Sequence, residues 1–174
     1  MKGLNAAFKS LTTSHNISET FENLLKTLQE ILHYENAFIL FEIQPGQYMS
    51  YYATHYDFLE RIWMSGDLFK SVESGKPQIV KNITYASEWH QHIDLQKHVK
   101  SALHFPLKGS KHNAMFVCTN SKEDFFNHSH FKITSHFIHF AAYAIKMLES
   151  NQSLKDEIIE REKVQAENAR LQAK

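Results

Sequence analysis

The sequence predicts an α+β domain: an antiparallel sheet with helices on both sides, and a long C-terminal helix that extends from it as a coiled coil. Three observations support this prediction. Apolar runs of strand length come in pairs separated by polar turns, an amphipathic helical stripe precedes the first pair, and no Gly or Pro occurs from Ser129 to the end. With 174 residues, 43% of them hydrophobic, the chain is long enough for one domain with its own core.

The first strongly periodic segment is a helix that begins near Ser18. This residue is a suitable N-cap, and Glu19 follows in the first turn. Apolar residues then recur at three- and four-residue spacing: Phe21, Leu24, Leu25, Leu28, Ile31 and Leu32. The same spacing predicts a shorter helix before it, through Leu4, Ala7, Phe8 and Leu11.

Two hairpins and an irregular middle follow the helix. Residues 37–41 are apolar at odd and even positions alike, which predicts a strand that is covered on both faces. Residues 48–54 are the predicted returning strand after a turn. The segment from Phe58 to Phe69 predicts one or two short helices, and 78–80 a short strand. Residues 85–100 form a polar, His-rich excursion of the kind that tends to be functional or mobile. The second hairpin pairs 102–107 with 114–118.

The last segment predicts a helix that is longer than the domain, because about 40 residues at 1.5 Å rise span about 60 Å. Its first part is apolar and its second part is highly charged. A seven-residue seam in the charged part places Leu154 and Asn168 at a, and Val164 and Leu171 at d. Ile158 is one place off and Arg161 occupies an a position, so the coiled coil needs further contacts at its ends. A frayed, charged terminus is the alternative.

Composition excludes several classes of function. The 19 Lys and Arg balance 19 Asp and Glu, which argues against nucleic-acid binding through a basic field. Neither GxGxxG nor GxxxxGK[ST] occurs, and the single Cys118 supplies neither an internal disulfide nor a cysteine zinc cluster. No apolar run approaches a membrane span and the start lacks a signal-peptide core, so we expect a cytoplasmic protein.

The order of these elements resembles a GAF domain, the small-molecule sensory module of signalling proteins, over residues 16–150. The similarity includes the helix-to-strand passage 28–40, the step Gly75-Lys76-Pro77 before a strand, and the strand 101–107 with its Pro. Phe126 and the Ala-rich helix after it resemble the family's closing helix. We therefore expect a GAF-like domain at 16–150, preceded by a helical segment at 1–15 and followed by a linker helix at 151–174.

The signatures of particular GAF subclasses are not met. Residues 120–126 resemble the start of the cyclic-nucleotide signature, but His128 and His130 stand near its acidic end. Cys118 lies in a predicted strand and is followed by Thr119, unlike a bilin attachment site, and one cysteine is too few for a free methionine sulfoxide reductase. The resemblance thus implies a small-molecule ligand whose identity is unknown, and it names no cofactor.

The charged tail carries a second resemblance. Residues 154–167 are similar to the linker helices that leave sensory modules in bacterial sensor histidine kinases and diguanylate cyclases. Such helices pair in parallel and pass a twist or register change onward. The resemblance implies a homodimer that relays a signal to a covalently linked output domain downstream. The expected dimer and signalling residues are Ile138, Ala141, Ile145, Leu148, Leu154, Val164 and Leu171.

Trp63, Trp89 and His104 are the candidate ligand-binding residues. The two tryptophans lie in the segments that cover the pocket in this family, and each offers stacking area and one N–H donor. If helices cover the Leu103 face of its strand, His104 points toward the cavity. Core packing is the alternative for all three.

The remaining constellations point to no chemistry of their own. The 12 histidines form loose groups without the ligand spacing of a metal site, and no nucleophile–base or paired-carboxylate arrangement is apparent. We therefore predict neither a metal site nor an enzyme. Two rivals to the sensory interpretation stay open: a ligand-free structural dimerisation module, and a protein that binds metal or haem through its histidines.

Overall fold

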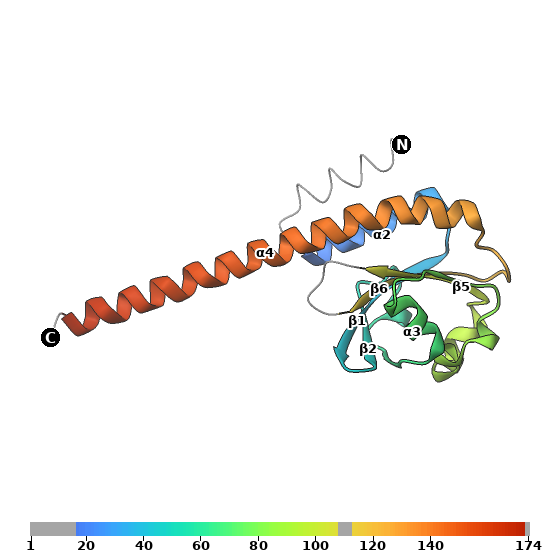
Figure 1. Ribbon diagram of the computed structural model, residues 1–174, viewed down its shortest axis with the longest axis horizontal. Helices are drawn as coiled ribbons and strands as arrows, with labels where there is room; N and C mark the ends of the chain where they lie inside the picture. The colour runs from blue at the N-terminus through green and yellow to red at the C-terminus, as the bar shows by residue number, and fades with distance from the viewer. Residues whose placement is uncertain (1–16, 108–112, 173–174) are drawn as a thin grey trace.

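A six-stranded antiparallel sheet forms the centre of the domain, with strand order β3-β2-β1-β6-β5-β4 (Figure 1). The computed structural model describes residues 17–107 and 113–172, so the helix expected at 4–11 lies outside the described residues. The strands are β1 (Asn36–Gln44), β2 (Gln47–Tyr51), β3 (Ile62–Met64), β4 (Gln78–Val80), β5 (Ser101–Leu107) and β6 (Ala114–Asn120). The α-helices are α2 (Ile17–Leu32), α3 (Asp67–Glu73) and α4 (His128–Gln172). This architecture confirms the predicted α+β fold.

Both predicted hairpins are present. β1 pairs with β2 and β5 pairs with β6, and β1 also lies against β6, with Ile39 opposite Phe116. The expectation of only short helices between Phe58 and Phe69 was wrong, because Ile62–Met64 is strand β3 and pairs with β2. A strand of three residues is too short for its alternation to be distinguished from a helical spacing.

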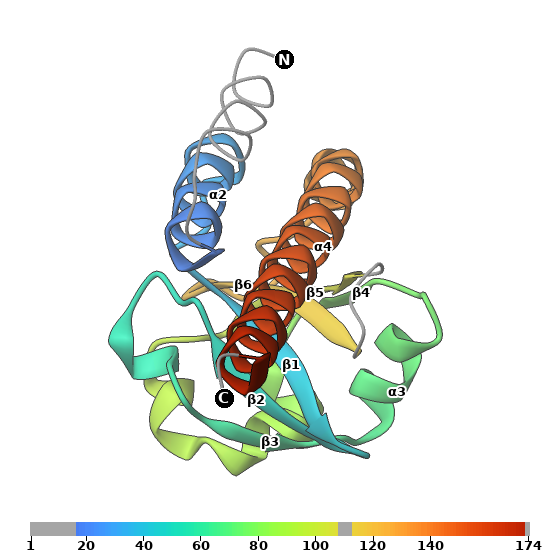
Figure 2. The same ribbon diagram turned by 90° about the vertical axis from the view of Figure 1, so that its left-hand side faces the viewer.

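Two long helices cover one face of the sheet (Figure 2). On α2, the buried residues Leu24, Leu25, Leu28 and Leu32 reproduce the predicted stripe. On α4, Phe137, Ile138 and Ala141 pack against the same layer. We call this side the helix face.

The opposite side of the sheet is covered by α3 and four short 3₁₀ helices. These are η1 (Tyr56–Phe58), η2 (Ile83–Tyr85), η3 (Ser87–Gln91) and η4 (Ile93–Lys97). Its core contains large rings from strands, α3, η1 and η3: Phe38, Tyr48, Phe58, Trp63, Phe69 and Trp89. We call this side the aromatic face.

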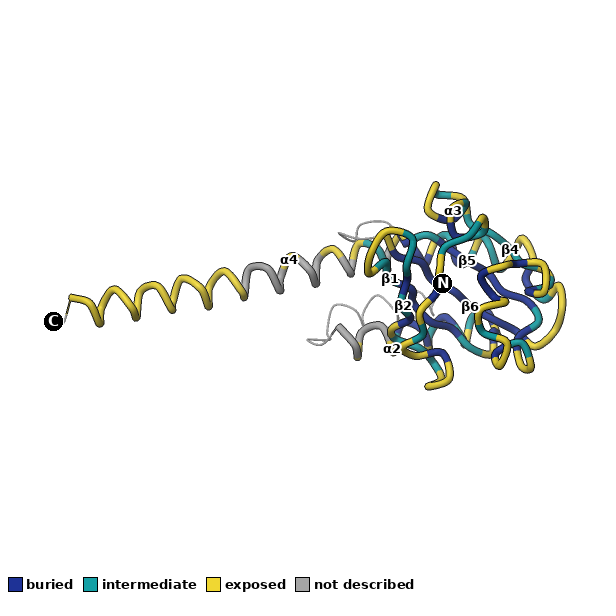
Figure 3. Tube along the Cα trace, turned by 90° about the horizontal axis from the view of Figure 1, so that it is seen from below, coloured by how far each residue is buried: buried dark blue, intermediate teal, exposed yellow. Residues whose placement is uncertain are grey.

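α4 continues far beyond the domain (Figures 1 and 3). It has 45 residues, and every side chain from 156 to 172 is exposed. The exposed residues include the apolar Ile158, Val164 and Leu171. None of the helices within residues 17–107 and 113–172 combines the length and the apolar character needed to cross a bilayer.

Candidate functional site

The three candidate ligand-binding residues come together in the core of the aromatic face. Trp63 and Trp89 meet edge to face with ring centroids 5.0 Å apart, and Trp89 and His104 do so at 6.1 Å. None of the three side chains is more than 1% exposed. Because Leu103 lies under the helices, its neighbour His104 points to the opposite side, as the alternation of a strand requires.

Phenylalanine rings enclose this cluster. Phe38 stacks on Trp63 with centroids 5.7 Å apart, and Phe69 of α3 lies 5.8 Å from the imidazole of His104. Aromatic pairs in these geometries stabilise by about 0.5–1.5 kcal/mol beyond the area that they bury. The site is therefore filled by its own side chains in this structure.

The hydrogen bonds of the cluster fix the protonation of His104. Trp89 Nε1 donates to His104 Nε2 at 3.2 Å, and because an indole N–H only donates, Nε2 must be the unprotonated nitrogen. Burial lowers the pKa of His104 to about 3, so the ring is neutral and carries its proton on Nδ1.

Two buried N–H donors of this cluster lack a partner. Among the residues that the structure describes, neither His104 Nδ1 nor Trp63 Nε1 has a hydrogen-bond acceptor. A buried polar group left unsatisfied costs about 1–3 kcal/mol. Two such groups in one cluster are therefore a feature that needs an explanation.

The irregular segment after η2 is held over this cluster by hydrogen bonds from its side chains. We call residues 87–97, which contain η3 and η4, the lid segment. Gln91 Oε1 accepts from the Met64 backbone N–H at 2.7 Å, and Gln91 Nε2 donates to the Met64 carbonyl at 2.8 Å. Strand β3 lies at the edge of the sheet, and Gln91 supplies hydrogen-bond partners for both backbone groups of Met64 on that edge.

A second fastening involves His92, Arg61 and Asp94. His92 Nε2 lies 3.0 Å from the Ile62 carbonyl, so it donates, and Nδ1 faces the Arg61 guanidinium at 3.3 Å as an acceptor. Burial and the neighbouring Arg61 charge lower the pKa of His92. Arg61 also holds both oxygens of Asp94, at 3.0 and 2.5 Å, and this hydrogen bonding lowers the pKa of Asp94.

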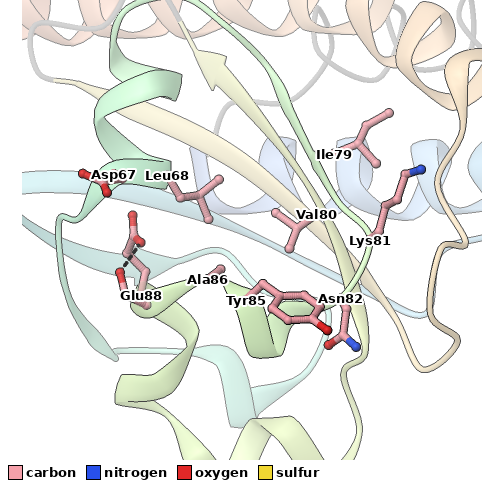
Figure 4. Close-up of a pocket in the computed structure, with 10 residues that line it drawn as sticks. Asp67, Leu68, Ile79, Val80, Lys81, Asn82, Tyr85, Ala86 and Glu88 are labelled. Carbon is pink, nitrogen blue, oxygen red and sulfur yellow. Dashed lines mark hydrogen bonds between the residues drawn. The ribbon is translucent and has the colours of Figure 1, made fainter.

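A surface pocket of about 430 Å³ opens beside the cluster, between α3, β4 and the turn that leads into the lid segment (Figure 4). Trp63, Trp89 and His104 are absent from its described lining, although Trp89 directly follows the lining residue Glu88. The lining residues are Asp67, Leu68, Ile79, Val80, Lys81, Asn82, Tyr85, Ala86, Ser87 and Glu88.

Glu88 is the buried acid of this pocket, and sequence reasoning missed it. Its side chain is 1% exposed, and Oε2 accepts from the backbone N–H of Phe69 at 2.6 Å, in the first turn of α3. A Cβ on Gly66 would lie 2.9 Å from Glu88 Oε1, so the glycine permits this approach. The only sequence signal was a glycine just before a helical segment, because the acid that caps the helix is far away in the chain.

The predicted dimer residues occupy different environments. Ile138 and Ala141 are buried in the helix-face core, whereas Val164 and Leu171 are exposed on the extended part of α4. The side chains of Ile145, Leu148 and Leu154 lie outside the described residues. Within the described ranges, no three His, Cys, Asp or Glu side chains converge on a possible metal position.

The structure thus defines a layered α+β module with one helix-covered face and one aromatic face beside a surface pocket. The family model described as GAF domain matches residues 14–146, and the chain belongs to the GAF domain family. GAF domains are sensory, ligand-binding regulatory domains of signalling proteins. No protein of curated function matches the sequence significantly.

Solved structures show the same fold at low sequence identity. The GAF domain of an Acinetobacter phosphoenolpyruvate-protein phosphotransferase is 9% identical with a TM-score of 0.68, over 86% of this chain and 93% of that one. A domain of a putative two-component sensor histidine kinase from Sinorhizobium meliloti is 17% identical with a TM-score of 0.60, over 82% and 99%. The phycoerythrobilin-bound GAF domain of a cyanobacterial phytochrome is 12% identical with a TM-score of 0.69, over 87% and 96%.

Proposed function

We propose that this chain is a cytoplasmic small-molecule sensor that forms a homodimer and relays ligand binding through α4 to an output domain beyond this chain. The observation that carries the proposal is the pair of unpartnered donors, Trp63 Nε1 and His104 Nδ1, buried in one aromatic cluster. A ligand that brings acceptors to both donors removes the cost of leaving them unsatisfied. Membership of a sensory family supports the same interpretation.

The chemistry of the cluster defines the kind of ligand. Two N–H donors select a molecule with carbonyl, carboxylate or ring-nitrogen acceptors, and the surrounding indole and phenyl rings favour a flat one. Because the cluster is filled, the lid segment must move for the ligand to enter. The pocket beside Glu88 is the opening through which this movement would start.

Strand β5 connects the site with the signalling helix. His104 lies on its aromatic face, and the next residue, Phe105, packs on Phe131 of α4 with ring centroids 5.3 Å apart. A shift of β5 on ligand binding would therefore reach the base of α4 directly. The ligand moves this equilibrium only if it binds the two arrangements with different affinities.

The extended part of α4 supports the dimeric half of the proposal. Ile158, Val164 and Leu171 are all at least half exposed, and long helices gain most of their stability by packing an apolar face. A parallel pair would cover this face and bring the two C-terminal ends together, as a two-fold output domain requires. Asn168 at a seam position would fix the register of the pair.

Ligand binding is tested with a thermal-shift screen of planar metabolites that carry acceptors, followed by tryptophan fluorescence of any stabilising compound. We expect a compound to raise Tm and to lose most of this effect in Trp63→Phe, which keeps a ring but removes the N–H donor. Tyr56→Phe, at an exposed position of η1, is the control and should respond as the parent does. The filled cluster favours one alternative, a ligand-free dimerisation module, and a screen without any stabilising compound would support it.

Assembly is tested by sedimentation of the whole chain and of a chain that ends at Ser150. We expect a dimer at tens of micromolar for the whole chain and weaker association after truncation. Val164→Glu should weaken the dimer through its buried charge, whereas Glu162→Gln, outside the seam, should not. A monomeric whole chain would remove the dimeric half of the proposal and leave the ligand site untouched.

A further inference from the structure

Phe69 of α3 lies against both rings that carry an unpartnered donor. Its ring centroid is 6.1 Å from that of Trp63 and 5.8 Å from that of His104, and its side chain is fully buried. A phenyl ring has no acceptor atom, so Phe69 cannot satisfy the N–H groups of Trp63 and His104. The space that the Phe69 ring fills therefore adjoins both donor-bearing rings.

Trp89 also lies against both rings, but hydrogen bonds hold it in place. Its Nε1 donates to His104 Nε2, and its backbone carbonyl accepts from Gln96 Nε2 at 3.1 Å. The Phe69 side chain has no polar atom and makes only packing contacts. Of the two residues, Phe69 is thus the one whose side chain can leave without breaking a hydrogen bond of its own.

The surface pocket beside Glu88 offers room for the Phe69 ring. Asp67 and Leu68, the two residues before Phe69, line this pocket of about 430 Å³ together with Ala86 and Glu88 (Figure 4). Pockets of about 300–1,000 Å³ hold whole ligands, so this one has room for a phenyl group. A small shift of α3 is therefore enough to carry the ring from the core into the pocket.

Glu88 connects the lid segment, to which it belongs, with the first turn of α3. Its Oε2 accepts from the Phe69 backbone N–H at 2.6 Å, and its Oε1 accepts from the Ser87 hydroxyl at 3.1 Å. At the other end of α3, Glu73 accepts a hydrogen bond from the Tyr48 hydroxyl. Displacement of the lid segment would therefore release the end of α3 near Phe69 and leave the end at Glu73 attached.

We propose that Phe69 is the residue that a ligand displaces, and that one flat ring of the ligand takes its place with acceptors toward Trp63 Nε1 and His104 Nδ1. The inference rests on the proposed ligand site and narrows its ligand to a single-ring compound with acceptor atoms, such as a pyrimidine-type heterocycle. Because a ring replaces a ring, the aromatic packing is retained. The gain comes from the two donors that the phenyl ring leaves unsatisfied.

Phe69→Ala in the full chain tests the space directly, because it leaves a ring-sized cavity that small compounds can fill. Pyrimidine and benzene are the probes, since they have the same size and only pyrimidine has acceptor atoms. Phe116→Ala, on the helix face, is the matched control. We expect the ratio of pyrimidine to benzene affinity to be about tenfold higher in Phe69→Ala than in Phe116→Ala, because pyrimidine satisfies buried donors only in the former. Equal ratios would overturn the proposal.

The indole N–H signals in NMR spectra give a second readout, because the chain has only two tryptophans. In Phe69→Ala, pyrimidine should move the Trp63 signal downfield, since Trp63 Nε1 gains an acceptor. The Trp89 signal should move less, because its Nε1 already donates to His104. Trp63→Phe assigns the two signals. A Trp63 signal that stays in place while pyrimidine binds would count against the displacement of Phe69.

A thiol at position 69 keeps the proposal testable if Phe69→Ala does not fold. Phe69→Cys should react with a maleimide about tenfold faster than Phe116→Cys, because α3 opens locally whereas the central strand β6 opens only with the whole domain. The native Cys118, buried in β6, gives the rate of global unfolding in the same sample. Equal rates at positions 69 and 116 would mean that Phe69 does not leave the core, which contradicts the proposal.

Failure of this inference and failure of the proposed function give different results. A metabolite that stabilises the parent through Trp63, combined with equal probe ratios in Phe69→Ala and Phe116→Ala, would overturn the role of Phe69 and leave the ligand site standing. A pyrimidine preference in Phe69→Ala, combined with a screen in which no metabolite stabilises the parent, would support the assignment of this space and count against the sensory function.

Discussion

The two faces of the sheet are covered by different kinds of side chain and secondary structure. The helix face is built mostly from aliphatic side chains on two long helices and three central strands. The aromatic face is built from rings carried by short helices, strand ends and the lid segment. The first is a regular layer, whereas the second is held by individual side-chain hydrogen bonds such as those from Gln91 to Met64.

Buried polar groups separate the two faces further. On the helix face, the hydroxyl of Tyr34 donates to the Leu25 carbonyl, and the Cys118 thiol has its pKa raised by burial. The aromatic face buries Glu88 and His104, and two of its N–H donors are unpartnered within the described residues, whereas the helix side has the buried Thr134 hydroxyl of α4 without a partner there. Unsatisfied groups that a fold tolerates are typical of places where function competes with stability. The helix face therefore holds the domain together, and the aromatic face is the adjustable side.

The largest expected effect is a difference between matched leucine deletions on the two faces. Leu28→Ala, on the buried side of α2 in the helix face, should cost about 3 kcal/mol, because a rigid layer leaves a cavity. Leu95→Ala, in the lid segment, should cost about half as much, because the short 3₁₀ helix around it can collapse. Urea denaturation of both variants gives the comparison. Equal losses would mean that the aromatic face is as rigid as the helix face.

The pH dependence of stability should come mainly from the aromatic face, with a further contribution from His130 of α4, whose pKa burial also lowers. His104 and His92 have folded pKa values below the unfolded value near 6.5, so the unfolded chain binds more protons as pH falls below it. Stability should therefore decrease on acidification, by about 1.4 kcal/mol per pH unit for His104 between pH 6.5 and its folded pKa. Protonated His92 would also present an N–H to the Arg61 guanidinium, which opposes the lid contact.

Chemical denaturation at pH 7.5, 6.5 and 5.5 measures this slope. His104→Leu should flatten it, although it also lowers stability at neutral pH by leaving Trp89 Nε1 without an acceptor. His136→Leu, at an exposed position of α4, is the control and should keep the parent slope. A parent slope that survives His104→Leu unchanged would assign the pH dependence to other groups.

The same contrast decides what could be predicted from the sequence. The helix face was predictable because Leu24, Leu28 and Leu32 repeat with the helical period, and the side on which His104 lies follows from strand alternation. Strand β3 was not predictable, because three residues carry too little periodicity and its free edge is completed by Gln91 and His92.

The polar groups of the candidate site could not be predicted from the sequence either, because their contacts follow no periodic pattern. Glu88 caps α3 from another segment, and the missing acceptors of Trp63 and His104 depend on the positions of individual side chains. Trp63 and Trp89 could be named as candidates because their residue type suggests a lined site wherever they lie in the chain. Contacts that are distant in the sequence and irregular in spacing leave no pattern to read.

The smallest expected effect lies in the lid segment. Asp94→Asn removes the charge that Arg61 holds, but the Asp94 side chain is 60% exposed, so global stability should change by less than about 1 kcal/mol. Local opening should change more, since this pair and Gln91 fasten the lid segment to β3. We expect the Met64 amide to exchange with solvent a few-fold faster, measured by native-state hydrogen exchange.

The pattern of exchange tells local opening from general loosening. The Phe116 amide, in the central strand β6, should keep its protection in Asp94→Asn, because only global unfolding exposes it. Glu30→Gln, on the exposed side of α2, removes a comparable charge from the helix face and should leave both amides unchanged. If Met64 and Phe116 instead lose protection together, the aromatic face opens only when the whole domain unfolds. The lid segment would then be a fixed part of the core, and a ligand could not enter by displacing it alone.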